Sequence, residues 1–208
     1  MKEHTVTAFD EELGQIGGLL NGMGELAGAM VSSATHALLA GDNALAQRVV
    51  SDDALMDSRQ RELDDRAITL IAKRQPMADD LRAVVGSIRM AGDLERIGDL
   101  AKNIAKRVGA VGQDAIPRTL SHSIDGMAQL VLEQVRGVVE RYTAGDTAGL
   151  ATLRNDDERI DVKYTAVFRE LLTYMMEDPR NITACTHLLF CAKNLERIGD
   201  HVTNVAEN

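Results

Sequence analysis

The chain has 208 residues, of which 45% are hydrophobic and 26% charged, and it carries a formal net charge of −9. Aromatic residues make up only 3%, there is no tryptophan, and there are three prolines. This composition supplies a core and favours helices packed through aliphatic side chains over strands. The negative charge would repel a phosphate backbone, which argues against nucleic acid as a partner.

The N-terminal sequence, the apolar runs and the cysteines predict the cellular location of the protein. The first twelve residues lack the apolar stretch of a signal peptide, and no apolar run approaches the ~20 residues of a membrane span. Cys185 and Cys191 are six residues apart on one expected helix. They should point about 240° apart, so a disulfide between them is not expected. These features predict a reduced, cytoplasmic location.

Prolines and two Ala-Gly-Asp triplets, at 40–42 and 144–146, divide the chain into six expected helices. In each triplet the glycine can end one helix and the aspartate can cap the next. The first helix carries five glycines within 14–24, which indicates either close approach of a neighbouring helix or a soft, partly irregular helix. We prefer the second interpretation. The helices are expected at 8–39, 43–74, 77–109, 118–143, 147–176 and 180–207.

The second half of the chain repeats the first. The block L-E-R-I-G-D occurs at 94–99 and again 101 residues later at 195–200. Aspartates at the cap and within the second expected helix of each half recur at an offset of 104 residues, as Asp42 and Asp146, Asp53 and Asp157, and Asp57 and Asp161. The sequence therefore predicts an all-α fold built as a tandem repeat of two three-helix bundles, 1–112 and 113–208.

The repeated block places acidic residues in a line along its helix. Glu95 and Asp99 are four residues apart, and on a helical wheel they turn away from the apolar stripe that contains Leu94 and Ile97. Two carboxylates at this spacing repel each other, so their recurrence needs a cause. Asn103 extends the line by one turn, and Glu196, Asp200 and Asn204 repeat it in the second copy.

The second helix of each copy carries a matching pair. If the second and third helices pack antiparallel, four carboxylates of each copy face one groove and need cations nearby. We call Asp53, Asp57, Glu95 and Asp99 the first acidic row, and Asp157, Asp161, Glu196 and Asp200 the second acidic row. Their oxygen donors predict two metal sites, with magnesium, manganese, calcium, iron or zinc as candidates. The alternative is a pair of solvated, metal-free helix faces.

Asp52 and Asp156 fall on the apolar stripe itself, where leucine would be expected. A buried carboxylate needs a partner, so each should meet a hydrogen bond, a salt bridge or a metal ion. Arg96 and Arg197, inside the repeated block, are the candidate partners.

With these motifs in place, the chain resembles the PhoU family of phosphate-uptake regulators. The resemblance rests on L-E-R-I-G-D-L-A-K-N-I at 94–104 and C-A-K-N-L-E-R-I-G-D-H-V-T-N at 191–204. It also rests on I-A-K-R-Q-P at 71–76, D-L-R at 80–82 and Y-M-M-E-D-P-R at 174–180. The resemblance implies two similar three-helix bundles whose acidic rows can carry multinuclear metal clusters.

The resemblance also implies a non-catalytic cytoplasmic adaptor, commonly a homodimer. Such an adaptor links the ATPase subunit of a phosphate transporter to a sensor histidine kinase and meets the membrane only through these partners. With phosphate plentiful it keeps phosphate-starvation genes off. The chain stops at Asn208, a few residues past the second block, so a longer last helix is expected in the full protein.

Two other functions compete with this one. A di-iron carboxylate enzyme would need Glu-x-x-His pairs facing a bundle core, and none of the five histidines has a glutamate three residues before it. There is also no G-x-x-x-x-G-K or G-x-S-x-G motif. The other competitor is a helical scaffold of the same architecture that binds no metal.

Overall fold

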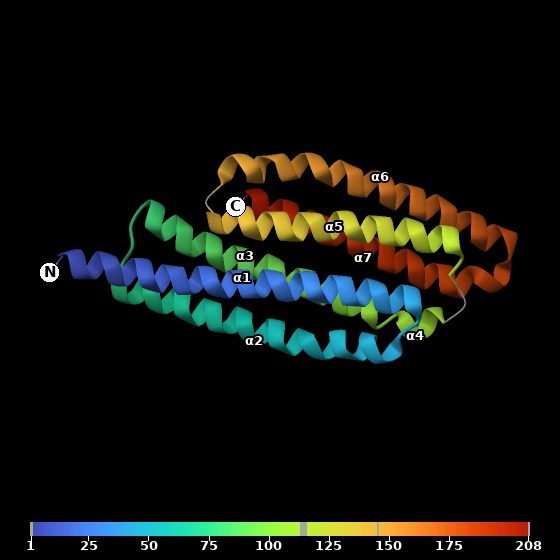
Figure 1. Ribbon diagram of the computed structural model, residues 1–208, viewed down its shortest axis with the longest axis horizontal. Helices are drawn as coiled ribbons and strands as arrows, with labels where there is room; N and C mark the ends of the chain where they lie inside the picture. The colour runs from blue at the N-terminus through green and yellow to red at the C-terminus, as the bar shows by residue number, and fades with distance from the viewer. Residues whose placement is uncertain (1, 113–115, 145, 208) are drawn as a thin grey trace.

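In the computed structural model, which describes residues 2–112, 116–144 and 146–207, long antiparallel helices form two side-by-side three-helix units (Figure 1). No strand occurs among these residues, so the predicted all-α tandem fold is confirmed. None of the helices described is both long and apolar enough to cross a bilayer. The elements are α1 (Lys2–Ala40), α2 (Asn43–Arg74), α3 (Asp79–Ala105), α4 (Val108–Val111), α5 (Arg118–Ala144), α6 (Thr147–Glu177), the short 3₁₀ turn η1 (Pro179–Asn181) and α7 (Ile182–Glu207).

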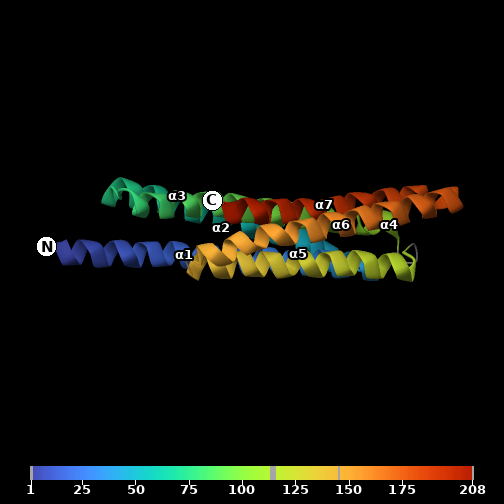
Figure 2. The same ribbon diagram turned by 90° about the horizontal axis from the view of Figure 1, so that it is seen from above.

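The units meet through α3 packed on α7 and α1 packed on α5, with α2 and α6 at opposite outer edges (Figures 1 and 2). One hydrophobic core runs through both units. Leu94 and Ile97 of the first block and Leu195 and Ile198 of the second are all buried in it. The repeated blocks therefore lie on the two helices that join the halves.

The helix starts follow the triplets. The Asp42 side chain accepts a hydrogen bond of 2.9 Å from the Leu45 N–H and caps α2, while Gly41 takes a left-handed φ of 66°. Asp146 caps α6 in the same way by accepting from the Gly149 N–H at 2.9 Å. Both cap assignments are confirmed, and Gly145 lies outside the described residues.

The third helix is shorter than expected. It begins at Asp79, after Gln75 has ended α2 in a left-handed conformation, and it ends at Ala105 instead of 109. A turn through Lys106 and Arg107 precedes α4. There the Arg107 guanidinium lies 4.3 Å from the Phe190 ring centroid and 3.2 Å from His187 Nδ1, both on α7. The break lies where the first unit is fastened to α7.

The glycines of α1 do not make it irregular, so the interpretation as a soft helix is wrong. α1 is one continuous helix, and at Gly24 it approaches α5 closely. A Cβ on Gly24 would lie 2.5 Å from Val139 Cγ2, whereas one on Gly14, Gly17 or Gly18 would have nothing within 4 Å. Close approach of a neighbouring helix therefore explains Gly24, and at Gly22 a Cβ would lie 3.2 Å from Arg59 Nη1 of α2.

The different surroundings of Gly24 and Gly18 allow a matched pair of variants to be compared. Gly24→Ala should lower the free energy of unfolding by about 1–3 kcal/mol, because the methyl group overpacks the contact with Val139. Gly18→Ala, in open space, should raise it by up to ~1 kcal/mol through helix propensity. Urea unfolding measures both. Two variants that shift stability in the same direction would contradict the assigned contact.

Candidate functional site

The first acidic row lies in a groove between α2 and α3. The helices approach closely where Gly98 meets Met56, since a Cβ on Gly98 would lie 3.2 Å from Met56 Cγ. This contact sets Asp53 and Asp57 of α2 alongside Glu95 and Asp99 of α3, close enough for the charges of both aspartates to act on Glu95. The side chains of Asp53, Glu95 and Asp99 are 15, 16 and 28% exposed. The row is partly buried beside the core.

A lysine inside the groove offsets this charge. The Lys102 ammonium donates hydrogen bonds to Asp53 Oδ2 at 2.7 Å and to Asp99 Oδ1 at 2.5 Å, and its side chain is only 18% exposed. Arg96 adds a weaker, more exposed contribution, 3.2 Å from Asp99 Oδ2 and 3.5 Å from Glu95 Oε2. Lys102 thus joins α2 to α3. Sequence reasoning missed it, although its place three residues after Asp99 was a usable signal.

The carboxylates of the row respond differently to this environment. Burial and the neighbouring charge of Asp99 raise the pKa of Glu95, against the smaller opposing effect of Arg96. Burial also acts to raise the pKa of Asp99, but the hydrogen bonds and charges of Lys102 and Arg96 outweigh it and hold that pKa below its usual value. Burial would lower the pKa of Lys102, yet Asp53 and Asp99 raise it overall. The charge of Glu95 is therefore less well compensated than that of Asp99.

The second acidic row is arranged differently. Glu196 accepts a hydrogen bond of 2.5 Å from Lys193, whose ammonium also lies 5.3 Å from the Tyr164 ring centroid. Asp161 and Asp200 are exposed, and the side chain of Asp157 lies outside the described residues. Glu196 Oε2 and Thr203 Oγ1 are buried without a hydrogen-bond partner. Asn103 and Asn204, the predicted extensions of the two lines, are both exposed.

The expectation for Asp52 is wrong. Asp52 is exposed, because the buried stripe of α2 runs through Val49, Met56 and Leu63 at intervals of seven residues and leaves the turn between them to polar side chains. Arg96 pairs with carboxylates of its own helix instead. The side chain of Asp156 lies outside the described residues, and Arg197 is exposed.

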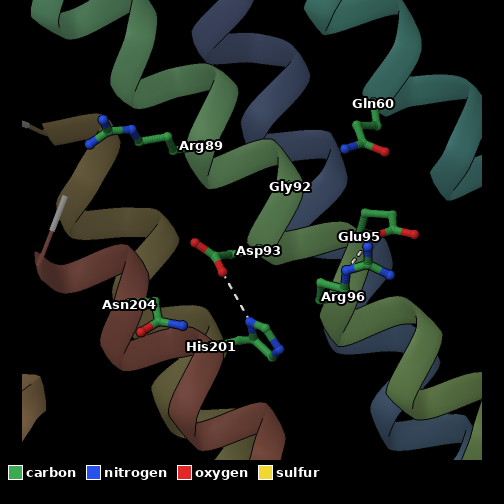
Figure 3. A pocket seen from close by; sticks show the side chains of 8 residues that line it. All are labelled: Gln60, Arg89, Gly92, Asp93, Glu95, Arg96, His201 and Asn204. Carbon is green, nitrogen blue, oxygen red and sulfur yellow. Dashed lines mark hydrogen bonds and ion pairs between the residues drawn. The ribbon is translucent and has the colours of Figure 1, made fainter.

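A hollow of about 680 Å³ adjoins Glu95 where the two units meet (Figure 3). His201 of α7 reaches across it to Asp93 of α3, with 2.9 Å between Nδ1 and Oδ1. The two residues are 108 positions apart, so no local sequence pattern could have paired them. The hollow is lined by Gln60, Arg89, Gly92, Asp93, Glu95, Arg96, His201 and Asn204.

The first acidic row does not form a ready metal site. Its oxygen donors suit hard cations, but the Lys102 ammonium contacts the oxygens that a cation would have to bind. Across the described side chains, no three His, Cys, Asp or Glu residues are grouped so that they could hold a metal ion. Metal binding at either row stays a prediction.

Comparison with known families identifies the fold. The model of the PhoU domain matches the chain twice, over residues 20–108 and 124–208, one match for each three-helix unit. The chain belongs to the PhoU family. The two matches coincide with the repeat that the acidic rows and the L-E-R-I-G-D blocks define.

Individual PhoU relatives match over almost the whole chain. A protein of Rhizobium meliloti named phosphate-specific transport system accessory protein PhoU homolog is 55% identical over 204 residues, 98% of this chain and 86% of the relative. A Caulobacter vibrioides protein of the same name is 46% identical over 207 residues, 100% of this chain and 90% of the relative.

Solved PhoU structures have the same fold. The crystal structure of PhoU from Pseudomonas aeruginosa superposes with a TM-score of 0.90 at 33% identity, covering 96% of this chain and 95% of that one. PhoU from Streptococcus pneumoniae superposes with a TM-score of 0.87 at 27% identity, covering 96% and 93%.

The contacts of Lys102 predict a stability effect. Lys102→Met should lower the free energy of unfolding by about 2 kcal/mol in buffer containing a chelator, because two partly buried carboxylates lose their charged partner. Lys106→Met removes an exposed lysine one turn further along and should change it by less than ~0.5 kcal/mol. Urea unfolding measures both, and equal stability of the two variants would contradict the bridge.

The raised pKa of Glu95 predicts a pH dependence. Charging this carboxyl disfavours the folded state, so Glu95→Gln should raise the melting temperature at pH 7 in metal-free buffer. The cost shrinks as the pH falls through the raised pKa and vanishes below the unfolded value of about 4.3. Calorimetry from pH 7 to below that value should show the gain disappear. A variant that melts lower than the parent at pH 7 would contradict this.

Proposed function

We propose that the chain is a non-catalytic accessory regulator of a phosphate-specific transport system. In this role it links the ATPase subunit of the transporter to a sensor histidine kinase and keeps phosphate-responsive genes off when phosphate is plentiful. The observation that carries the proposal is the 55% identity, over 98% of the chain, with a protein named as an accessory protein of such a system. The proposal includes a cytoplasmic location and a homodimer, as the family resemblance implies.

The structure supplies features that suit an adaptor. Two similar units are fastened together along α3 and α7 by a shared core and by the pairs Asp93–His201 and Arg107–Phe190. A molecule built this way offers two related surfaces with a fixed spacing. Exposed acidic residues, Asp161 on α6 and Asp200 on α7, lie on the second unit. Such charges favour encounter with a basic partner surface and set the orientation of docking.

The test is deletion of the gene in its own organism, with a phosphate-responsive reporter read at high and low phosphate. We expect the deletion to raise reporter expression at high phosphate and to leave it unchanged at low phosphate. Complementation with the wild-type chain should restore repression. Unchanged expression at high phosphate after deletion would contradict the proposed function.

Two further complementing genes locate the docking face. Asp161→Lys combined with Asp200→Lys reverses exposed charges of the second acidic row and should fail to restore repression. Asp125→Lys reverses one exposed charge on α5 and should restore it. Full restoration by the double variant would exclude this row as the docking face.

A further inference from the structure

We propose that the outer side of the α6–α7 hairpin is a docking surface for an amphipathic helix of a partner protein. The partner helix carries apolar side chains in one half and lysines or arginines in the other. The surface has an acidic end at Asp161 and Asp200 and an apolar end at Leu172, Met176 and Ile182. This inference rests on the proposed adaptor role for its biological meaning, and its test measures binding by itself.

The apolar end lies beside the turn η1, which joins α6 to α7 (Figure 1). Leu172 and Met176 are 41 and 86% exposed, and they are neighbours on α6 because they are four residues apart. Ile182, the first residue of α7, is 47% exposed. Aliphatic side chains that gather on the surface in this way mark a place where another molecule binds.

The apolar end and the acidic end lie along the same side of the hairpin. On α6, Asp161 and Leu172 are eleven residues apart, which at ~100° per residue leaves them within about 20° of each other. On α7, Ile182 and Asp200 are eighteen residues apart, which is about five full turns. A ligand that contacts both ends therefore lies lengthwise along α6 and α7.

A helix fits the length and the pattern of this surface. The eleven residues from Asp161 to Leu172 span about 16 Å, so a partner helix needs about three turns between its basic and its apolar side chains. Helices commonly bind to such surfaces through apolar anchors spaced three and four residues apart.

The acidic end selects the charge of the partner. Asp161 and Asp200 are exposed, and the nearby Lys193 donates its hydrogen bond to Glu196 Oε1. Basic side chains that reach these two carboxylates gain attraction, and acidic ones are repelled. The apolar end supplies buried area, and the acidic end sets the direction in which the partner helix lies.

Exposed aliphatic residues recur in the first unit at the two offsets that relate the acidic rows. Ile68, 60% exposed, corresponds to Leu172 at the offset of 104, and Leu81, 37% exposed, corresponds to Ile182 at the offset of 101. A pair of exposed residues that is repeated together with the acidic rows is part of the duplicated design. Scattered single exposures would not follow both offsets.

The first unit differs at its acidic end. Lys102 bridges Asp53 and Asp99 there, with its ammonium 2.7 Å from Asp53 Oδ2 and 2.5 Å from Asp99 Oδ1. A basic helix gains less from carboxylates that already have a charged partner. Docking is therefore assigned to the α6–α7 surface, and Ile68 supplies a matched control on the other unit.

The experiment is binding of a labelled synthetic peptide to the purified full chain, measured by fluorescence anisotropy in buffer containing a chelator. The peptide is an alanine-based helix of about twenty residues, with leucines at spacings of three and four in one half and lysines at the same spacings in the other. The wild type should bind it. Met176→Glu and Leu172→Glu should each weaken binding by about tenfold or more, because each places a charge under the leucines.

The controls test each end of the surface separately. Ile68→Glu puts the same charge on the first unit and should leave the affinity within about twofold. Asp161→Asn combined with Asp200→Asn should weaken binding and reduce its salt dependence. Asp125→Asn removes an exposed charge on α5 and should change neither.

Three results would overturn the inference: no binding by the wild type, equal losses in Ile68→Glu and Met176→Glu, or equal binding of a peptide whose leucines and lysines are interleaved. Met176 is 86% exposed, so its variant keeps the test decisive should Leu172→Glu fold poorly by circular dichroism. Derepression of the reporter on gene deletion, together with no peptide binding, would reject this surface and leave the regulatory role standing. Specific peptide binding without any reporter effect would support the surface and reject the regulatory role.

Discussion

The bridge from Lys102 to Asp53 and Asp99 is the interaction on which the first acidic row depends. The row places carboxylates one helical turn apart on each helix and opposite one another across a groove. Charges so close, and partly removed from water, repel strongly unless a cation lies between them. The helices are held close at Gly98, so the acids cannot separate. The Lys102 ammonium contacts carboxylates of both helices and so reduces this repulsion.

The two copies share the same helical arrangement but differ in the position of the lysine that pairs with the acidic row. Both keep glycine beside the acidic line and buried aliphatic residues beneath it. The first copy has its lysine deep in the groove, whereas the second has Lys193 towards the other end, stacked on Tyr164 and half exposed. A duplicated motif thus carries two electrostatic environments. Glu95, whose negative charge is only partly compensated, lies at the edge of the first acidic row and also lines the hollow between the units.

The helices and the repeat could be predicted from the sequence because both depend on local patterns. The capping by Asp42 and Asp146 follows from residue type and spacing alone. The sequence pattern places Asp52 on the buried stripe. In this part of α2 successive buried residues are seven positions apart, so the residues between them, Asp52 included, do not face the core. α3 ends before the predicted residue 109, at a turn where Arg107 contacts His187 of α7, and that contact joins residues eighty positions apart.

The site was only partly predictable. Spacing of four residues located the acidic lines, but nothing local shows which cation fills a groove between two helices. Lys102 meets Asp53 across 49 residues, and His201 meets Asp93 across 108. Such pairs depend on the register of helices packed in three dimensions, which one sequence does not reveal.

The most direct test of the account is a double-mutant cycle between Lys102→Met and Asp99→Asn, with the free energy of unfolding measured in chelator. A bridge within a partly buried groove predicts a coupling energy of about 1–2 kcal/mol between the two positions. Additive effects, with a coupling energy near zero, would show that the ammonium does not hold the row together.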